Sequence, residues 1–308
     1  MAILDLPLLA ADDVPWRPRI AAFADPWPGA VAVSIGTPGT GYVARQALTR
    51  RATMGMLTAP LGAGPVGRLD RANAITVRLH GGALASAPLA AVLNGANLAA
   101  IGSEADGWEV VQFGTATMLD AETWRLTGLL RGQAGTIDRT EAGHGEGATF
   151  VLLNAAVESL ALAEAEAGLS LTARCGPAGA TYDPDIFVDA AFAAARRGLM
   201  CLRPVHLRAR RVAGGDVAIR FVRQTRTGGD AWEPAEVPLG ETAEAYLVEI
   251  LDGTTVRRTI AVATPEAIYP AAAQIADFGG LPASLALRVA QVSPTEGPGL
   301  SATATLAL

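Results

Sequence analysis

The stretch "WRLTGLLRGQAGT", Trp124 to Thr136, places three glycines and two arginines directly after an aromatic and apolar run. Residues 124–130 have the composition of a β-strand, and the glycines after them permit a bulge and a tight turn. We therefore expect Trp124, Leu126 and Leu129 to be buried, and Gly132 or Gly135 to adopt a positive φ or to lie against neighbouring backbone. Arg131 is expected to be held by a carboxylate or by backbone carbonyls, because its five donors form a fixed fork. The structural motif that we predict comprises Trp124, Leu126, Gly128, Arg131, Gly132 and Gly135.

The same stretch does not predict a phosphate-binding loop. Its glycines lack the G-x-x-x-x-G-K-[ST] spacing, and no helical pattern follows to supply a helix terminus for an anion. All 24 basic side chains other than histidine are arginines, so Schiff-base chemistry on a lysine is also excluded. The motif is therefore interpreted as an architectural strand and turn.

Outward from this motif, the first half of the chain is predicted to be mainly β. Proline-rich residues 1–30 should run extended, because each proline removes a donor and disfavours helix in the residue before it. Residues 91–102 carry Asn94-Gly95 between apolar runs, which predicts a hairpin. Further short runs rich in β-branched or aromatic residues lie at 30–35, 74–80, 108–113 and 148–153.

The middle of the chain is less regular. Residues 155–168 favour helix by composition but lack a clean 3.6-residue period, whereas residues 189–198 predict a short helix that ends in Arg196-Arg197-Gly198. A domain boundary is placed near 198–204. The expected organisation is a β-rich domain over 1–200, with one or two subdomains, and a second domain over 201–308.

The last third of the chain predicts a β-sandwich. Residues 205–212 and 217–226 alternate in polarity around Gly214-Gly215-Asp216, and residues 245–251 and 256–263 form a second hairpin around Asp252-Gly253. Strands at 285–293 and 301–308 complete six or more strands in about 105 residues. The residues expected to point inward are Val217, Ile219, Phe221, Leu285, Leu287 and Val289.

Composition excludes several classes of function. A net charge of −6 argues against nucleic acid as a partner, and no apolar run reaches the ~20 residues of a membrane helix. The acidic N-terminus lacks the basic leader of a signal peptide. Cys175 and Cys201 lack metal spacing and are expected to be free, buried thiols.

No spacing of residues nominates a catalytic, cofactor or metal site. The histidines His80, His144 and His206 are scattered, and the G-x-x-G-x-G order at 34–42 departs from the dinucleotide fingerprint. His144 lies between Glu141 and Glu146 in a glycine-rich segment that we expect to be a solvated loop. The seven arginines between Arg203 and Arg226, against one acid, predict a solvated sheet face or one side of a protein interface. The chain is therefore not expected to be an enzyme, and no cofactor is expected.

The motif "WRLTGLLRGQAGT" resembles the L-x-G-L-L-R-G-x-x-G-T signature of phage-like tail-tip hub proteins. These comprise the host-specificity proteins of long-tailed phages and the "megatron" hub proteins of gene transfer agents. Other stretches that match in order are 24–33, 201–211, 214–233 and 277–293, so the resemblance spans nearly the whole chain.

The resemblance implies the C-terminal portion of a longer hub protein, ending in a fibronectin type III-like module. It implies a virion component of the baseplate, made in the bacterial cytoplasm and assembled at the tail tip. Its implied partners are other tail-tip proteins, two further copies of the chain in a homotrimer, and a host receptor or glycan. Neither nucleic acid binding nor membrane insertion is implied. The family's cell-wall-degrading activity belongs to domains that are absent from this sequence.

Two other functions stay open at this point. One is a carbohydrate-binding module that contacts host glycans through exposed tryptophans, for which Trp108 and Trp232 are the candidates. The other is an accessory domain of a cell-wall hydrolase, or a hydrolase with a dispersed site around His144.

Overall fold

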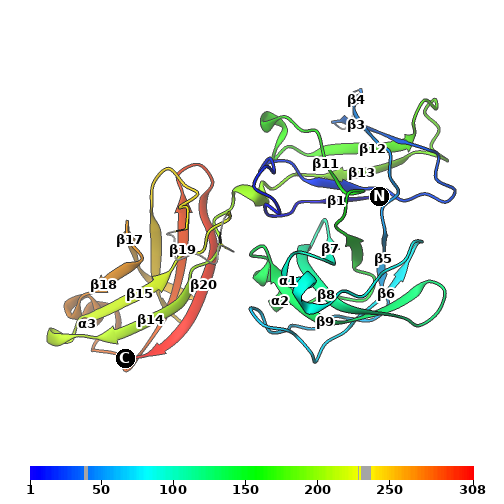
Figure 1. Ribbon diagram of the computed structural model, residues 1–308. Helices are drawn as coiled ribbons and strands as arrows, with labels where there is room; N and C mark the ends of the chain where they lie inside the picture. The colour runs from blue at the N-terminus through cyan, green and yellow to red at the C-terminus, as the bar shows by residue number, and fades with distance from the viewer. Residues whose placement is uncertain (38–40, 228, 230–236) are drawn as a thin grey trace. The chain divides into compact units, whose positions relative to one another are not determined.

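A computed structural model describes residues 1–37, 41–227, 229 and 237–308 (Figure 1). The described chain is mainly β, with several antiparallel sheets and a few short helices, as the sequence predicts. It folds into two compact units, Met1–Gly198 and Leu199–Leu308. Each unit is described by itself.

The first unit contains a closed six-stranded barrel, drawn from blue through cyan to green in Figure 1. Its strands pair antiparallel all the way around, in the order β10-β5-β6-β9-β8-β7. The interior is an apolar core to which every strand contributes, including Phe113 of β8 and Leu126 of β9. The strands are β5 (Met54–Leu57), β6 (Ile75–Leu79), β7 (Leu98–Ser103), β8 (Gly107–Met118), β9 (Thr123–Gln133) and β10 (Thr149–Leu152), with short helices α1 (Leu89–Leu93) and α2 (Ile137–Ala142) between them.

Two further sheets complete the first unit. One has the order β13-β12-β3-β4 and the other the order β1-β2-β11. Successive residues of β1 and β2 belong to different cores: Ile3 and Ile20 pack with the four-stranded sheet, whereas Leu4 and Ala21 pack with the outside of the barrel. The elements are β1 (Ala2–Leu4), β2 (Arg19–Ala21), β3 (Val31–Gly36), β4 (Val43–Leu48), β11 (Glu158–Ser159), β12 (Leu171–Pro177), β13 (Val188–Phe192) and the 3₁₀ turns η1 (Glu164–Glu166) and η2 (Arg197–Leu199).

The second unit is a β-sandwich of a three-stranded and a four-stranded sheet around one apolar core. The sheets have the orders β14-β15-β18 and β17-β16-β19-β20. The two hairpins predicted for this unit are confirmed by antiparallel pairing, β19 and β20 form a third, and the six predicted inward residues are buried. The elements are β14 (Val205–Arg211), β15 (Val217–Val222), β16 (Tyr246–Asp252), β17 (Thr255–Val262), β18 (Glu266–Tyr269), β19 (Ser284–Ser293), β20 (Gly297–Ala307), α3 (Ala271–Phe278) and the 3₁₀ turn η3 (Ala213–Gly215).

Two local predictions are wrong. Asn94 and Gly95 do not turn a hairpin; Asn94 is the C-cap of α1, and Gly95 has a φ of 93°. The error has a physical reason, since a glycine with positive φ suits a helix end as well as a hairpin turn. The helix expected over 189–198 is instead β13, which pairs with β12, followed by η2. Here long-range strand pairing overrides the helix propensity of the alanines.

The segment 155–168 contains no α-helix. It forms the two-residue strand β11 and the 3₁₀ turn η1.

Cys175 and Cys201 are free and buried, as expected, and burial raises the pKa of the Cys175 thiol to about 11. Burial and the contact with Glu241 raise the pKa of the Cys201 thiol to about 12, so neither thiol is in the reactive thiolate form at neutral pH.

Candidate functional site

The motif of residues 124–136 occupies β9 and the turn that follows it. Trp124 is 9% exposed, and Leu126 and Leu129 are fully buried, which confirms their predicted burial. Gly132 and Gly135 have φ angles of 63° and 81°, in the region that favours glycine. A Cβ at Gly132 would also lie 2.9 Å from Thr140 Oγ1.

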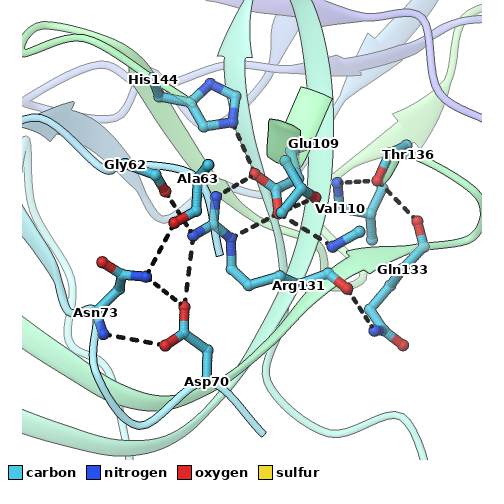
Figure 2. Close-up of polar contacts among 12 residues, drawn as sticks. Gly62, Ala63, Asp70, Asn73, Glu109, Val110, Arg131, Gln133, Thr136 and His144 are labelled. Atoms are coloured by element: carbon cyan, nitrogen blue, oxygen red, sulfur yellow. Dashed lines mark hydrogen bonds and ion pairs between the residues drawn. The ribbon is translucent and has the colours of Figure 1, made fainter. Parts of the chain in front are cut away.

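Arg131 points into a buried polar cluster at one end of the barrel (Figure 2). Its Nε and Nη2 donate to the two carboxylate oxygens of Glu109, at 2.7 and 2.8 Å. Its Nη1 donates to the carbonyl of Gly62 at 3.1 Å and lies 3.8 Å from Asp70 Oδ2. The prediction that a carboxylate or backbone carbonyls hold Arg131 is confirmed, by the Glu109 carboxylate together with the carbonyl of Gly62.

Glu109 accepts three hydrogen bonds besides those from Arg131. The backbone N–H of Gly132 and the hydroxyl of Thr140 donate to Oε1, at 3.0 and 2.8 Å. His144 Nε2 lies 2.8 Å from Oε2. Burial alone would raise the pKa of Glu109, but hydrogen bonds from His144, Arg131 and Thr140 and the charge of Arg131 lower this pKa to about 2. Glu109 is therefore an ionised carboxylate inside the protein.

Asp70 holds the other side of the cluster. Its Oδ1 accepts the backbone N–H groups of Ala72 and Asn73, both at 3.0 Å, and its Oδ2 accepts from Asn73 Nδ2 at 2.7 Å. Burial favours a higher pKa for Asp70, but these bonds and the charge of Arg131 lower it below its usual range. Asp70 is also joined to β9 by two backbone hydrogen bonds with Leu129, at 2.8 and 3.0 Å.

The cluster fastens two loops to the barrel. The loop after β5 pairs with His144 through Leu61, whose backbone donates one hydrogen bond to His144 and accepts one from it, both 2.8 Å long, and with Leu129 through Asp70. The chain after α2 supplies His144 to Glu109, and α2 itself supplies Thr140. Because Arg131, Glu109 and Asp70 have side chains with 0% exposure, the charges are satisfied internally and are closed to solvent.

The expectation that His144 lies in a solvated loop is wrong. Its side chain is only 5% exposed, and its Nε2 lies against a carboxylate that already meets Arg131. A general base needs a free lone pair within reach of substrate. Glu109 instead directs its oxygens to Arg131, Thr140, His144 and Gly132. This geometry is that of a structural cluster, in which the carboxylate holds parts of the chain in place.

Of the two tryptophans predicted to contact glycans, only Trp108 lies in the described part of the chain, and it is buried. Trp108 is 5% exposed and lies in the core between β1, β2 and the barrel, so it is not a surface platform. Its burial follows from the near-continuous apolar run of β8, whose residues 108–113 are all buried. Trp232 lies outside the described residues.

Sequence reasoning missed Glu109 and Asp70. The available signal was Glu109 itself, a carboxylate in the apolar run "WEVVQF". A charged residue at such a position is seldom fully buried unless it is paired.

Among the described residues, no group of three or more histidine, cysteine or acidic side chains has the arrangement to hold a metal ion. No helix in the described ranges is long and apolar enough to cross a membrane.

Comparison with known proteins matches one family model and a set of solved structures that includes the one described below. A search of curated proteins finds no match. Domains d3-d4 of the rat CD45 extracellular region are 11% identical, with a TM-score of 0.23; the match covers 51% of this chain and 72% of that one. Residues 52–151, which begin two residues before β5 and end inside β10, match the family model described as Rcc01698-like, C-terminal. The barrel that carries the Arg131 cluster is thus the part of the chain that resembles this family.

Proposed function

We propose that the chain is a structural component of a phage-like tail tip, of the gene transfer agent or long-tailed phage type, that contributes to hub architecture and host attachment. The observation that carries the proposal is that the Rcc01698-like match covers residues 52–151, which hold both the barrel and the "WRLTGLLRGQAGT" motif. The motif lies inside the matched residues, on β9 and the turn after it.

The Arg131 cluster supports an architectural role. The motif's arginine is used inside the protein, on Glu109 and Gly62, rather than toward a ligand. A buried ion pair with complete hydrogen bonding fixes the relative positions of the strands and loops that supply it. A hub that transmits force between tail and host surface needs such fixed loops, and it needs no turnover. We therefore assign the chain no catalytic role of its own.

The proposal includes the assembly that the hub resemblance implies. The chain would act at the tail tip as one of three copies, in contact with other baseplate proteins, after synthesis in the bacterial cytoplasm. Host attachment would use surfaces outside the Arg131 cluster, because that cluster is closed to solvent.

Immunogold electron microscopy of native particles tests this proposal. An antibody raised against the purified chain should label one end of each particle, at the tip of the tail. Antibody absorbed beforehand with the purified chain is the control and should leave the tips unlabelled. Particles that carry label on the capsid, or that lack label while the chain is present in the lysate, would contradict the proposal.

A further inference from the structure

The outer face of the sheet β14-β15-β18 concentrates positive charge. Side chains on these strands alternate between the sandwich core and solvent. We call the solvent side of this sheet the arginine face. Its exposed residues are His206, Arg208 and Arg210 on β14, Arg220 and Val222 on β15, and Glu266 and Ile268 on β18.

Strand register sets these arginines against one another. Arg208 lies directly opposite Arg220, and Arg210 lies opposite Ala218. Like charges placed directly opposite destabilise a sheet, so this arrangement is not explained by folding. Glu266 meets Arg220 at 3.1 Å, and it is the one acid among the exposed residues of these three strands.

The other arginines of this region are used differently. Arg211 donates to Gln274 and to the carbonyls of Gly215 and Pro282, and Arg226 forms an ion pair with Glu241 at 2.6 Å. Within the described residues, Arg208 and Arg210 make no such hydrogen bond or ion pair. The sequence over 199–308 has ten arginines and eleven acids, so the excess charge of the face is local to it.

The spacing of the face suits a polymer of anions. Arg208 and Arg210 are two residues apart, which places them about 7 Å apart along the strand. Arg220 is about 5 Å across from Arg208. A guanidinium fork matches a carboxylate, sulfate or phosphate group. Exposed Val222 and Ile268, at 51% and 54%, add apolar surface against which the C–H faces of sugar rings can pack.

A nucleic acid fits the face less well. Single-stranded chains are held through bases stacked on aromatic side chains, and no Trp, Tyr or Phe is exposed on these three strands. A polysaccharide with anions at intervals of one or two sugars needs no aromatic platform and can meet the arginine side chains directly.

We propose that the arginine face binds an anionic polysaccharide, with Arg208, Arg210 and Arg220 as the anion-binding side chains. This inference deepens the host-attachment part of the proposed function, because acidic glycans coat bacterial surfaces. Binding is measured on the purified chain, so it can fail or succeed whether or not the antibody labels tail tips.

The experiment measures binding of the purified chain to polygalacturonate by calorimetry, with neutral dextran as the uncharged probe. Wild-type protein should bind polygalacturonate and not dextran. The double variant Arg208→Ala/Arg210→Ala should bind at least tenfold more weakly, and the slope of log affinity against log salt should fall by roughly 1 to 2. Ala218→Glu should cause a similar loss without removal of any arginine, because it sets a carboxylate opposite Arg210.

The matched control is Arg257→Ala/Arg288→Ala, which removes two arginines of the other sheet that are ion-paired with Asp252 and Glu249. It should bind within twofold of wild type. Thermal unfolding of each variant verifies that it is folded. Absence of polygalacturonate binding, an equal loss in the control, or equal affinity for duplex DNA at the same charge concentration would overturn the inference. An acidic protein bound by the face in place of the polysaccharide would overturn it as well.

Discussion

Arg131 and Glu109 are joined by two hydrogen bonds of 2.7 and 2.8 Å, and neither side chain has any exposure to solvent. The pair links β9 to β8, whose strands are already neighbours in the barrel. Its particular contribution is that the same carboxylate also receives Thr140 and His144 from the chain after β9. The position of the chain after β9 therefore depends on one charge, that of Glu109.

We expect Glu109→Ala to destabilise the protein by about 3–5 kcal/mol, because it leaves the Arg131 guanidinium buried without its partner. Urea unfolding at pH 7 measures this change. The control is Glu249→Ala, which breaks the partly exposed pair with Arg288 and should cost at most about 1 kcal/mol. Equal losses in the two variants would show that the buried pair does not carry the stability assigned to it.

The lowered pKa of Glu109 predicts how stability depends on pH. Burial opposes the charged form, but His144, Arg131 and Thr140 bring the folded-state pKa to about 2, whereas an unfolded glutamate titrates near 4.3. The folded state thus holds fewer protons between these values. The contribution is fully present above about pH 4.3 and is lost as pH falls toward 2. Over this range wild type should lose on the order of 3 kcal/mol more stability than Glu109→Gln, and urea midpoints at pH 6 and pH 3 should already show most of the difference.

Three glycine-to-alanine substitutions separate backbone strain from steric overlap. Gly145→Ala should be neutral, because Gly145 has open space around it and no positive φ. Gly67→Ala should cost about 1–2 kcal/mol, because its φ is 69° but nothing lies within 4 Å. Gly132→Ala should cost more than Gly67→Ala, because a Cβ there would meet Thr140 Oγ1 at 2.9 Å and Ile137 Cα at 3.2 Å as well. Thermal melts of the three variants give the order, and a Gly132→Ala melt equal to that of Gly67→Ala would contradict the steric argument.

His144→Ala tests whether the Arg131 cluster has a structural role or is an active site. We expect the purified wild-type chain to show no hydrolysis of peptidoglycan or ester substrates above that of a mock purification. The variant should lose about 1–3 kcal/mol of stability, because Glu109 Oε2 loses one of its partners. Turnover by wild type that disappears in His144→Ala, while Thr140→Val retains it, would instead assign a catalytic role to His144.

The sequence predicted the second unit in more detail than the first for a physical reason. Val217, Ile219 and Phe221 alternate with outward residues, and adjacent strands in sequence pair through short turns, so local pattern determines the hairpins. Barrel closure depends on pairs such as Ile75 with Leu126, far apart in sequence, which no local pattern specifies.

In the candidate site, too, local sequence predicted some features, whereas contacts between residues distant in sequence determine the others. The motif predicted that Arg131 would be held, because an arginine beside tight turns has donors to satisfy. It could not identify Glu109 as the partner, since 22 residues separate the two and only the register of β8 against β9 brings them together. Trp108 was mispredicted as exposed because its residue type alone suits glycan contact, whereas the near-continuous apolar run that it begins indicates burial.

Phe221 and Val222 are adjacent on β15 but face opposite sides of the second unit, which gives a matched pair for testing the sandwich. Phe221 is buried, with its ring centroid 4.9 Å from that of Tyr246 in an edge-to-face contact, whereas Val222 is 51% exposed. We expect Phe221→Ser to cost at least about 3 kcal/mol, because it opens a cavity and buries a hydroxyl. Val222→Ser should change stability by less than about 0.5 kcal/mol. Both variants are best measured by urea unfolding of residues 199–308 expressed alone, which should unfold in one cooperative transition if this unit is a domain. A gradual transition would refute the domain prediction, and equal stabilities of the two variants would refute the assignment of the core face of β15.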